Sequence, residues 1–393
     1  MNKNILVIKG HSRYNVLRIA ADYVASSFEK LGYNVTVTDL LLQEERDGFA
    51  SLITNKYDLV YSFQALLYDI CSAGDNTSDF SAFTDKLFFG HIVDHPIYHD
   101  CRLNIQHGDN MFVGFIDRNH VEFTKQYYKG VKNVSYLSHG GVIAQNLVSF
   151  KDREIEVLFP SSYEDPFVVL NELNNMEDVY KGISNILIEL MLKDSLMTLQ
   201  DALILYFKSI NFQYTDDEFI LMIHQFLGVD QYIRAYTRDL LIKELLRNGI
   251  NITVCGAGWE NFEADFKSNL KIYGEHGLDL EEVTELMGNS KFVLNHVPTF
   301  QNGMHERIYT SMRCGAICIT NDFPIVHEEF TDGEDIILYS YNGGKELANR
   351  MKELLVNLDK GEMIATQGKI IADASHKWED NALKILKLVG LEK

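Results

Sequence analysis

The sequence predicts an α/β protein with two doubly wound, Rossmann-like domains and a helical insertion at the start of the second domain. Short β-branched apolar runs alternate with longer amphipathic segments in both halves, which is typical of parallel sheets covered by helices on both faces. The chain has 393 residues, of which 46% are hydrophobic, enough for two cores. A long helical stretch interrupts the second series of strands.

The first half is predicted to form one parallel sheet. The expected strands lie at residues 5–8, 34–38, 59–61, 92–93, 111–116 and 134–137. Residues 13–32 have helical spacing and end at a glycine, a common helix terminator. We place the N-terminal domain at residues 1–152, because the polar stretch 148–154 is the best candidate for a boundary.

The second half is predicted to form the other sheet, in a domain covering residues 153–375. The expected strands lie at residues 155–159, 250–255, 271–273, 292–297, 316–320 and 336–339. The helical insertion at 175–249 carries apolar positions that need a surface to bury against. We therefore expect it to pack on the second domain.

Composition and charge restrict the partners. The balance of 36 basic against 56 acidic residues gives a net charge of −20, which disfavours nucleic acid or an anionic membrane as the main partner. Any phosphate site must therefore be local. No window of eighteen uncharged apolar residues occurs, and the apolar part of the N-terminus is too short for a secretion signal. The five cysteines are an odd number and widely spread, so we expect a reducing, cytoplasmic location.

The segment from Gly303 to Asp322 is the most informative stretch. It lies between two apolar runs and is predicted to form a loop and a helix, at about 304–314, between two parallel strands. Met304, Ile308 and Met312 recur four apart and form a packing stripe, while Gly303, Arg307 and Thr310 share another face. A cation beside the free N–H groups of a helix N-terminus suits a diphosphate. The alternative is that Arg307 only pairs with a surface carboxylate.

Lys9 to Arg13 follow the first expected strand. Gly10 lets a turn form there, and Ser12 can cap the next helix. The backbone around Gly10, His11 and Ser12 also suits contact with a phosphate or an acceptor. The two interpretations stay open, but the three spaced glycines of a dinucleotide fingerprint are absent.

His91, His95 and His99 are four residues apart, a spacing that would suggest zinc on a helix. Pro96 interrupts such a helix, and no cysteine or carboxylate pattern completes a site, so we predict no metal. Transfer to a hydroxyl needs a proton acceptor. We propose His95 for that role, with Asp94 orienting it or acting instead and His99 as third choice. The alternative is a pair that only stabilises a turn.

Other candidate residues end expected strands or follow them, where ligands bind in open α/β sheets. They are His139 and Gly140 after the last strand of the first half, Gly256 and Gly258 before a Trp259 expected in the core, Tyr273 and Gly274 in the stretch to Gly277, Asn295 and His296, and Asp322. Arg234 and Arg238 share a helical face, which we interpret as a solvated stripe among acids.

The segment 303–322 resembles the donor-binding segment of the group 1 glycosyltransferases, in their CgeB-like branch. The stretches 256–259, 94–96 and 139–141 are similar to recurring elements of that branch. Larger families of this kind have two glutamates eight apart that bind the sugar and the ribose. Their positions fall here on Asn302 and Thr310, so those roles are not carried over.

The resemblance implies a GT-B fold, in which the last helix, 376–393, packs back on the N-terminal, acceptor-side domain. It implies transfer of a sugar from a nucleotide-diphosphate sugar, with UDP as the expected nucleotide, to a hydroxyl of a protein or glycan, without a metal. Arg307 would counter the diphosphate charge. The further residues assigned to the donor are Asn302, Gly303, Met304, His305, Glu306 and Thr310. A sugar-nucleotide epimerase or hydrolase and a non-catalytic coat or scaffold protein are the alternatives.

Overall fold

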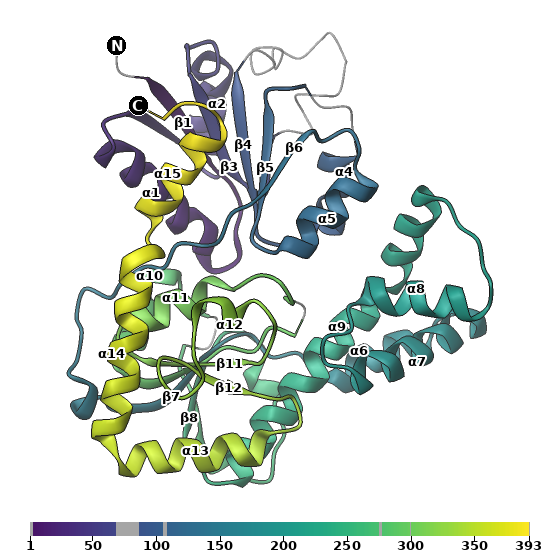
Figure 1. Cartoon of the computed structure of the whole chain (residues 1–393), viewed down its shortest axis with the longest axis vertical. Helices are drawn as coiled ribbons and strands as arrows, with labels where there is room; N and C mark the ends of the chain where they lie inside the picture. Colours follow the sequence, from purple (N-terminus) through teal and green to yellow (C-terminus); the bar gives the residue numbers. More distant parts are fainter. Residues whose placement is uncertain (1–2, 68–85, 105–107, 275–276, 299, 393) are drawn as a thin grey trace. The chain divides into compact units, whose positions relative to one another are not determined.

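The computed structural model describes residues 3–67, 86–104, 108–274, 277–298 and 300–392. Backbone contacts divide the chain into two compact units (Figure 1). The first unit contains the chain up to Gly141, the short segment Asn302–Glu306, and the C-terminal segment from Ala374. The second unit contains Val142–Gln301 and Arg307–Asp373.

The first unit is built on a six-stranded parallel sheet with the strand order β2-β1-β3-β4-β5-β6. Its strands are β1 (Asn4–Lys9), β2 (Asn34–Asp39), β3 (Leu59–Phe63), β4 (Leu87–Ile92), β5 (Met111–Phe115) and β6 (Asn133–Tyr136). The order reverses between β1 and β3, so the loops that follow these two strands diverge at the carboxyl edge of the sheet.

The helices of the first unit come from the beginning, the middle and the end of the chain. They are α1 (Val16–Lys30), α2 (Gln43–Leu52), α4 (Asp100–Leu103), α5 (Arg118–Tyr127) and α15 (Trp378–Leu388). The C-terminal helix α15 packs against α1 (Figure 1). Trp378 at its start is buried over Gly140, where a Cβ would lie 2.6 Å from the indole ring. The amide of Gly141 donates to the carbonyl of His376 at 2.7 Å, which fixes the same junction.

The second unit contains another parallel sheet of six strands, in the order β12-β11-β10-β7-β8-β9. Its strands are β7 (Ile155–Pro160), β8 (Ile252–Cys255), β9 (Leu270–Ile272), β10 (Ser290–Leu294), β11 (Ile317–Asn321) and β12 (Ile337–Tyr339). Alternate residues of a strand enter different cores: Phe292 and Leu294 pack on one face, and Val293 on the other. Both faces are buried, as a doubly wound sheet requires.

The helices of the second unit cover this sheet and also form a separate lobe. They are α6 (Pro166–Asn174), α7 (Asp178–Lys193), α8 (Leu199–Ser209), α9 (Asp216–Arg247), α10 (Leu280–Gly288), α11 (Glu306–Arg313), α12 (Val326–Glu329), α13 (Gly344–Val356) and α14 (Leu358–Ser375). We call α6 to α9 the helical lobe; Figure 1 shows its outer part extending away from the sheet of the second unit.

The helical lobe differs from the expected insertion in two respects. It begins at Pro166, before the predicted residue 175, because Asp165 caps α6 by accepting from the amide of Phe167. Its apolar residues pack mainly on one another, since α9 contacts α6, α7 and α8. Only the end of α9, including Leu241 and Leu245, enters the core beside the sheet. The helix α9 therefore connects the lobe to the core beside the sheet.

The first unit ends at Gly141, before the boundary predicted at residue 152. The residues between these positions pack on the second unit because Ala144 and Phe150 enter its two cores. Element ends also differ: β4 covers Leu87–Ile92 where the prediction had 92–93, and α11 begins at Glu306, not at Met304.

The two parallel sheets confirm the predicted fold class of two doubly wound, Rossmann-like domains. In the part of the chain that the structure describes, no helix combines the length and apolarity needed to span a bilayer.

We predict that Trp378→Ala destabilises the first unit by about 3–5 kcal/mol, because it empties a buried site that α15 fills. Urea unfolding followed by circular dichroism measures this. Leu383→Ala on the same helix is the control, since Leu383 is 44% exposed, and it is expected to cost under about 1 kcal/mol. Equal losses for the two variants would contradict the role given to Trp378.

Candidate functional site

Arg307 points inward in the second unit. It lies in the first turn of α11 and is half-buried. Its Nη1 donates to Oδ1 of Asn295 at 2.7 Å. Asn295 is itself buried and fixed, because its Nδ2 donates to Thr320 Oγ1 at 2.9 Å. Asn295 immediately follows β10, so the guanidinium is held at the carboxyl end of the central strands.

Arg238 joins Arg307 there, from a different element. It lies on α9, and its Nη1 donates to the carbonyl of Ser162, just after β7, at 2.6 Å. Burial, then the charges of Arg307 and Arg234, lower the pKa of the Arg238 guanidinium to about 10, against the smaller opposing effects of Glu164 and Tyr339. Its buried Nε has no hydrogen-bond partner among the described residues. The interpretation of Arg238 as part of a solvated stripe was therefore wrong.

His296 is a neutral, fixed neighbour of the two arginines. Its Nε2 lies 2.9 Å from Thr237 Oγ1, and its Nδ1 lies 2.7 Å from the hydroxyl of Tyr339. Thr237 uses its own proton to donate to the carbonyl of Ile233, so Nε2–H donates to Thr237 and Nδ1 accepts from Tyr339. Burial, then the charges of Arg238 and Arg307, lower the pKa of His296 well below 6.5.

Together, Arg238 and Arg307 form what we call the arginine pair. Both guanidinium groups are partly removed from water, and the charge of Arg307 disfavours the charged form of Arg238. Arg234, one turn before Arg238, is already paired with Asp230 at 3.1 Å. Two adjacent cations at the point where the strand order reverses, between β7 and β10, favour an anion. A diphosphate has the charge and the oxygen acceptors that two guanidinium groups bind.

The glycines after β8 have a packing explanation. Gly256 has a φ of 138° and Gly258 a φ of 93°. A Cβ on Gly256 would lie 2.8 Å from the backbone of Ser161, and one on Gly258 would overlap the carbonyl of Tyr163. Trp259, expected in the core, is fully buried there and donates from Nε1 to the Ser161 carbonyl at 2.6 Å. These contacts fix the loop whose Ser162 carbonyl accepts from Arg238.

The segment before α11 belongs to the first unit. The backbone amide of Asn302 donates to Asp117 Oδ2, and its Nδ2 donates to Asn119 Oδ1. Its carbonyl accepts from the amide of Arg118 at 2.9 Å. Gly303 forms an antiparallel bridge to Asp117, and a Cβ on Gly303 would overlap the Ile116 carbonyl. Backbone approach therefore explains this glycine without a ligand.

The remaining predicted residues of this stretch have diverse environments. Met304 is fully buried, and Thr310 Oγ1 accepts from the amide of Val142 at 3.2 Å, so both have structural roles. His305 is half-buried and lies 3.6 Å from Glu306, measured from Nδ1 to Oε1. Donor contacts by His305 and Glu306 stay predictions.

The loop after β1 is strained in a way that the sequence did not indicate. Tyr14 and Asn15 both have a φ of 55°, a conformation that non-glycine residues rarely adopt. Ser12 Oγ accepts from the amide of Leu17 at 2.9 Å, but the N-cap position of α1 is occupied by Asn15 and not, as expected, by Ser12. His11 is exposed. A Cβ on Gly10 would overlap only Cδ2 of Leu66, the end of a flexible side chain, so a donor contact by Gly10 stays a prediction.

The candidate bases after β4 differ in exposure. His95 Nδ1 accepts from the amide of Ile97 at 3.2 Å, which caps a short helical turn. Burial, then the neighbouring His120 and His99, lower the pKa of His95 well below 6.5, and burial lowers the pKa of His99 to about 4. Low basicity weakens both as proton acceptors. Asp94 is exposed, which makes it the better candidate.

Gln64 holds Asp94 in place and was missed from the sequence. Its Nε2 donates to Asp94 Oδ2 at 2.5 Å, and its Oε1 accepts from the amide of Val93 at 3.2 Å. Gln64 and the next residue, Ala65, have φ angles of 58° and 49°. Such left-handed conformations give no reliable signal in glutamine or alanine, so a single sequence does not reveal them.

His139 lies in a buried aromatic cluster of the first unit. Its ring centroid is 5.7 Å from His91, 5.9 Å from Trp378 and 6.4 Å from His305. Burial, then His91, lower the pKa of His139 well below 6.5, and burial lowers the pKa of His91 to about 3. Gly140 is required by the close packing of Trp378. His139 is therefore a neutral, buried residue of this aromatic cluster.

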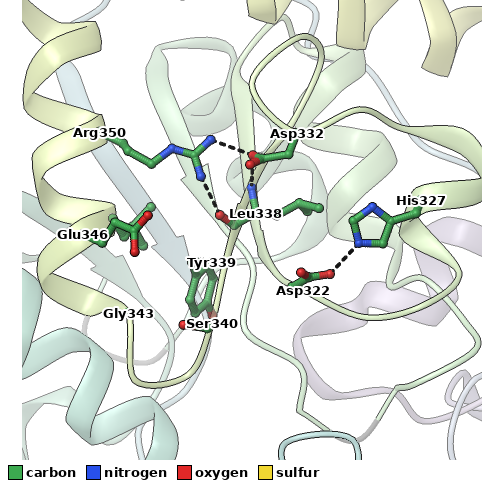
Figure 2. Close-up of a pocket in the computed structure, with 10 residues that line it drawn as sticks. Asp322, His327, Asp332, Leu338, Tyr339, Ser340, Gly343, Glu346 and Arg350 are labelled. Atoms are coloured by element: carbon green, nitrogen blue, oxygen red, sulfur yellow. Dashed lines mark hydrogen bonds and ion pairs between the residues drawn. The ribbon is translucent and has the colours of Figure 1, made fainter.

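Asp322 opens into a cavity of about 240 Å³ at the carboxyl end of β11 and β12. Figure 2 shows a hydrogen bond between Asp322 and His327 and an ion pair between Asp332 and Arg350, each 2.6 Å long. Tyr339 also lines this cavity, while its hydroxyl contacts His296. Asp322 follows β11, the strand next to β10. Its contact with a sugar stays a prediction.

Tyr273 follows β9 with its side chain 42% exposed, and its amide donates to the Val254 carbonyl at 2.8 Å. Gly274 has a φ of 73°, which favours glycine at that turn. Glu275 and His276, in the same predicted stretch, lie outside the described residues. No group of side chains suited to a metal ion occurs among the residues that the structure describes.

We predict that the protein loses stability as the pH falls below about 6.5. Burial lowers the pKa of His91 and of His120 to about 3, whereas the unfolded chain titrates near 6.5. Between these values the unfolded state binds protons that the folded state does not. Each such histidine then costs up to about 1.4 kcal/mol per pH unit. Urea midpoints measured from pH 7 to pH 5 test this, and His91→Leu should flatten the slope. A pH-independent midpoint would contradict it.

Residues 234–387 match the model of a family described as glycosyl transferase-like, a match that includes both members of the arginine pair. No curated protein sequence matches the chain.

Solved structures show the same fold along the whole chain. HepE from Anabaena, determined with UDP-glucose, is 12% identical with a TM-score of 0.56 and covers 98% of this chain and 99% of its own. Sucrose-phosphate synthase from Thermosynechococcus elongatus is 9% identical with a TM-score of 0.58 and 98% coverage of both chains. An alpha-glucosyltransferase solved with UDP-glucose and DNA is 10% identical with a TM-score of 0.56, covering 99% and 100%. These structures confirm the predicted fold of two Rossmann-like domains, and residues 234–387 are similar to a glycosyl transferase-like family.

Proposed function

We propose that this protein transfers a sugar from a UDP-sugar to a hydroxyl group of a protein or glycan, with the donor diphosphate bound by the arginine pair. The observation that carries the proposal is that two guanidinium groups are fixed at the carboxyl end of the central strands, Arg238 by the Ser162 carbonyl and Arg307 by Asn295. The charge of Arg307 disfavours the charged form of Arg238, and an anionic ligand would offset that effect. UDP-glucose in the HepE structure supports a uridine donor.

The arginine pair fits the charge that develops during transfer. As the glycosidic bond breaks, negative charge grows on the leaving diphosphate. Guanidinium groups held in advance stabilise that charge without reorganisation. Asn295 fixes one of them through its 2.7 Å hydrogen bond, and the Ser162 carbonyl fixes the other at 2.6 Å. In this scheme the cations are supplied by arginine, and the transfer needs no metal.

The first unit supplies the acceptor side in this proposal. If the reaction inverts configuration, Asp94 takes the acceptor proton, because it is exposed and oriented by Gln64, whereas His95 is a weak base. The net charge of −20 favours a protein or glycan acceptor over DNA. We also assign the chain to the CgeB-like branch, from the segment 303–322. A cytoplasmic location is supported by free thiols at Cys255, Cys314 and Cys318.

We predict that Arg238→Ala and Arg307→Ala each lower donor turnover by at least about a hundredfold, the effect of removing a contact to transition-state charge. UDP release from a panel of UDP-sugars measures this, with and without acceptor proteins and glycans. Arg247→Ala is the matched control, because Arg247 lies on the same helix as Arg238 and is exposed. Its turnover is expected to be unchanged.

A binding measurement with UDP and UDP-sugars distinguishes a loss of catalysis from an incorrect functional assignment. Thermal shift should show stabilisation of the wild type by UDP and loss of that stabilisation in both arginine variants. Stabilisation by UDP-sugar with conversion of the sugar but no transfer would favour the epimerase or hydrolase. No stabilisation by any nucleotide sugar would favour the scaffold and reject the proposed transfer.

Metal independence has a direct test. Turnover of the active UDP-sugar is measured with and without EDTA, at about a tenfold excess of EDTA over protein. The two rates should be equal, because the arginine pair carries the charge. Restoration by Mg²⁺ or Mn²⁺ after a loss in EDTA would show that a metal takes part.

A further inference from the structure

The helix α7 of the helical lobe presents an apolar stripe to solvent. Its members are Val179, Ile183, Ile186 and Leu190, spaced four, three and four residues apart. Val179 is 70% exposed and Ile186 is 42% exposed, while the other two are half-buried. This alternating spacing is the seam of a two-stranded coiled coil. We call these four residues the α7 seam.

The α7 seam is separate from the face that holds α7 in the lobe. The residues of α7 that are buried in the lobe are Ser184, Leu187, Ile188 and Met191. They lie on a different side of the helix, since residues at 100° steps place the two sets about a third of a turn apart. Gly182 borders the seam, and a Cβ there would meet nothing within 4 Å. A neighbouring helix can therefore approach this face closely.

We propose that the α7 seam is the contact between two copies of this protein, which pair antiparallel about a two-fold axis near residues 184 and 185. In that register Val179 of one copy faces Leu190 of the other, and Ile183 faces Ile186. The same surface patch serves on both sides, as a two-fold interface requires. Each exposed side chain of the seam then enters an apolar environment.

Charge supports a second copy in this orientation. The helix α7 carries Asp178 and Glu189 against Lys181 and Lys193, so it is neutral in a chain with a net charge of −20. In an antiparallel pair, Asp178 at the start of one α7 helix lies close to Lys193 at the end of the other. The same contact recurs at the opposite end of the seam. Parallel pairing would place like charges opposite one another. Lys193 is 70% exposed and pairs within its own helix only with Glu189, at 2.5 Å.

The first experiment measures association by sedimentation equilibrium of the whole protein. The wild type is expected to form dimers, and Val179→Glu with Ile186→Glu should weaken dimerisation at least about tenfold, because charges enter the seam. Met363→Glu is the matched control: Met363 lies on α14, is 70% exposed like Val179, and should leave the dimer unchanged. Circular dichroism confirms that each variant is folded. A monomeric wild type, or equal weakening by the control, would overturn the proposal.

Two further variants test the orientation. Lys193→Glu should weaken the dimer, and adding Asp178→Lys should restore it, since the charges are then exchanged. With Cys101→Ser to remove an exposed thiol, Ile183→Cys with Ile186→Cys should form an intermolecular disulfide, whereas Ile186→Cys alone should not. Efficient cross-linking through the single cysteine would show parallel pairing and reject the antiparallel register.

Discussion

The structure of the site depends on two guanidinium groups that are fixed at the carboxyl end of the central strands of the second unit. Arg307 is fixed by a buried asparagine after β10, and Arg238 is fixed by a carbonyl after β7. These two strands are neighbours at which the order of the sheet reverses, so the fold itself brings the cations together. Two fixed cations at this edge suit an anionic group such as a diphosphate, and the proposed function rests on that relation.

The rest of the second unit supports this arrangement. The long helix α9 begins in the helical lobe with a capping box and ends in the core beside the sheet, so Arg238 stands on a rigid element. Burial, then the charges of the two arginines, lower the pKa of His296 and keep it neutral, and its ring links Thr237 to Tyr339. A neutral imidazole there adds no third positive charge. The lobe has its own exposed seam on α7, which gives it a proposed role in pairing two copies.

The fold was predictable because both periodicities are strong in the sequence. Runs such as Ile5–Ile8 and 155–159 have too few polar residues for anything but a buried strand, and their order implied two parallel sheets. Arg307 was predictable from its place after a strand. Arg238 was not, because a basic residue on an amphipathic helix has the same local pattern whether it faces water or a partner from another element.

Several predicted ligand contacts proved to have structural reasons that only coordinates reveal. Gly303 is required by the approach of Asp117, and Gly258 by the carbonyl of Tyr163; both partners are distant in sequence. Gln64 was missed because its left-handed backbone leaves no signature in residue type.

The most direct test of the account compares two ligands that differ only in the diphosphate. Isothermal titration of the wild type with UDP and with uridine measures what the arginine pair contributes. We predict that UDP binds at least about a hundredfold more tightly than uridine and that Arg238→Ala removes most of this difference. Equal affinity for UDP and uridine would contradict the central claim.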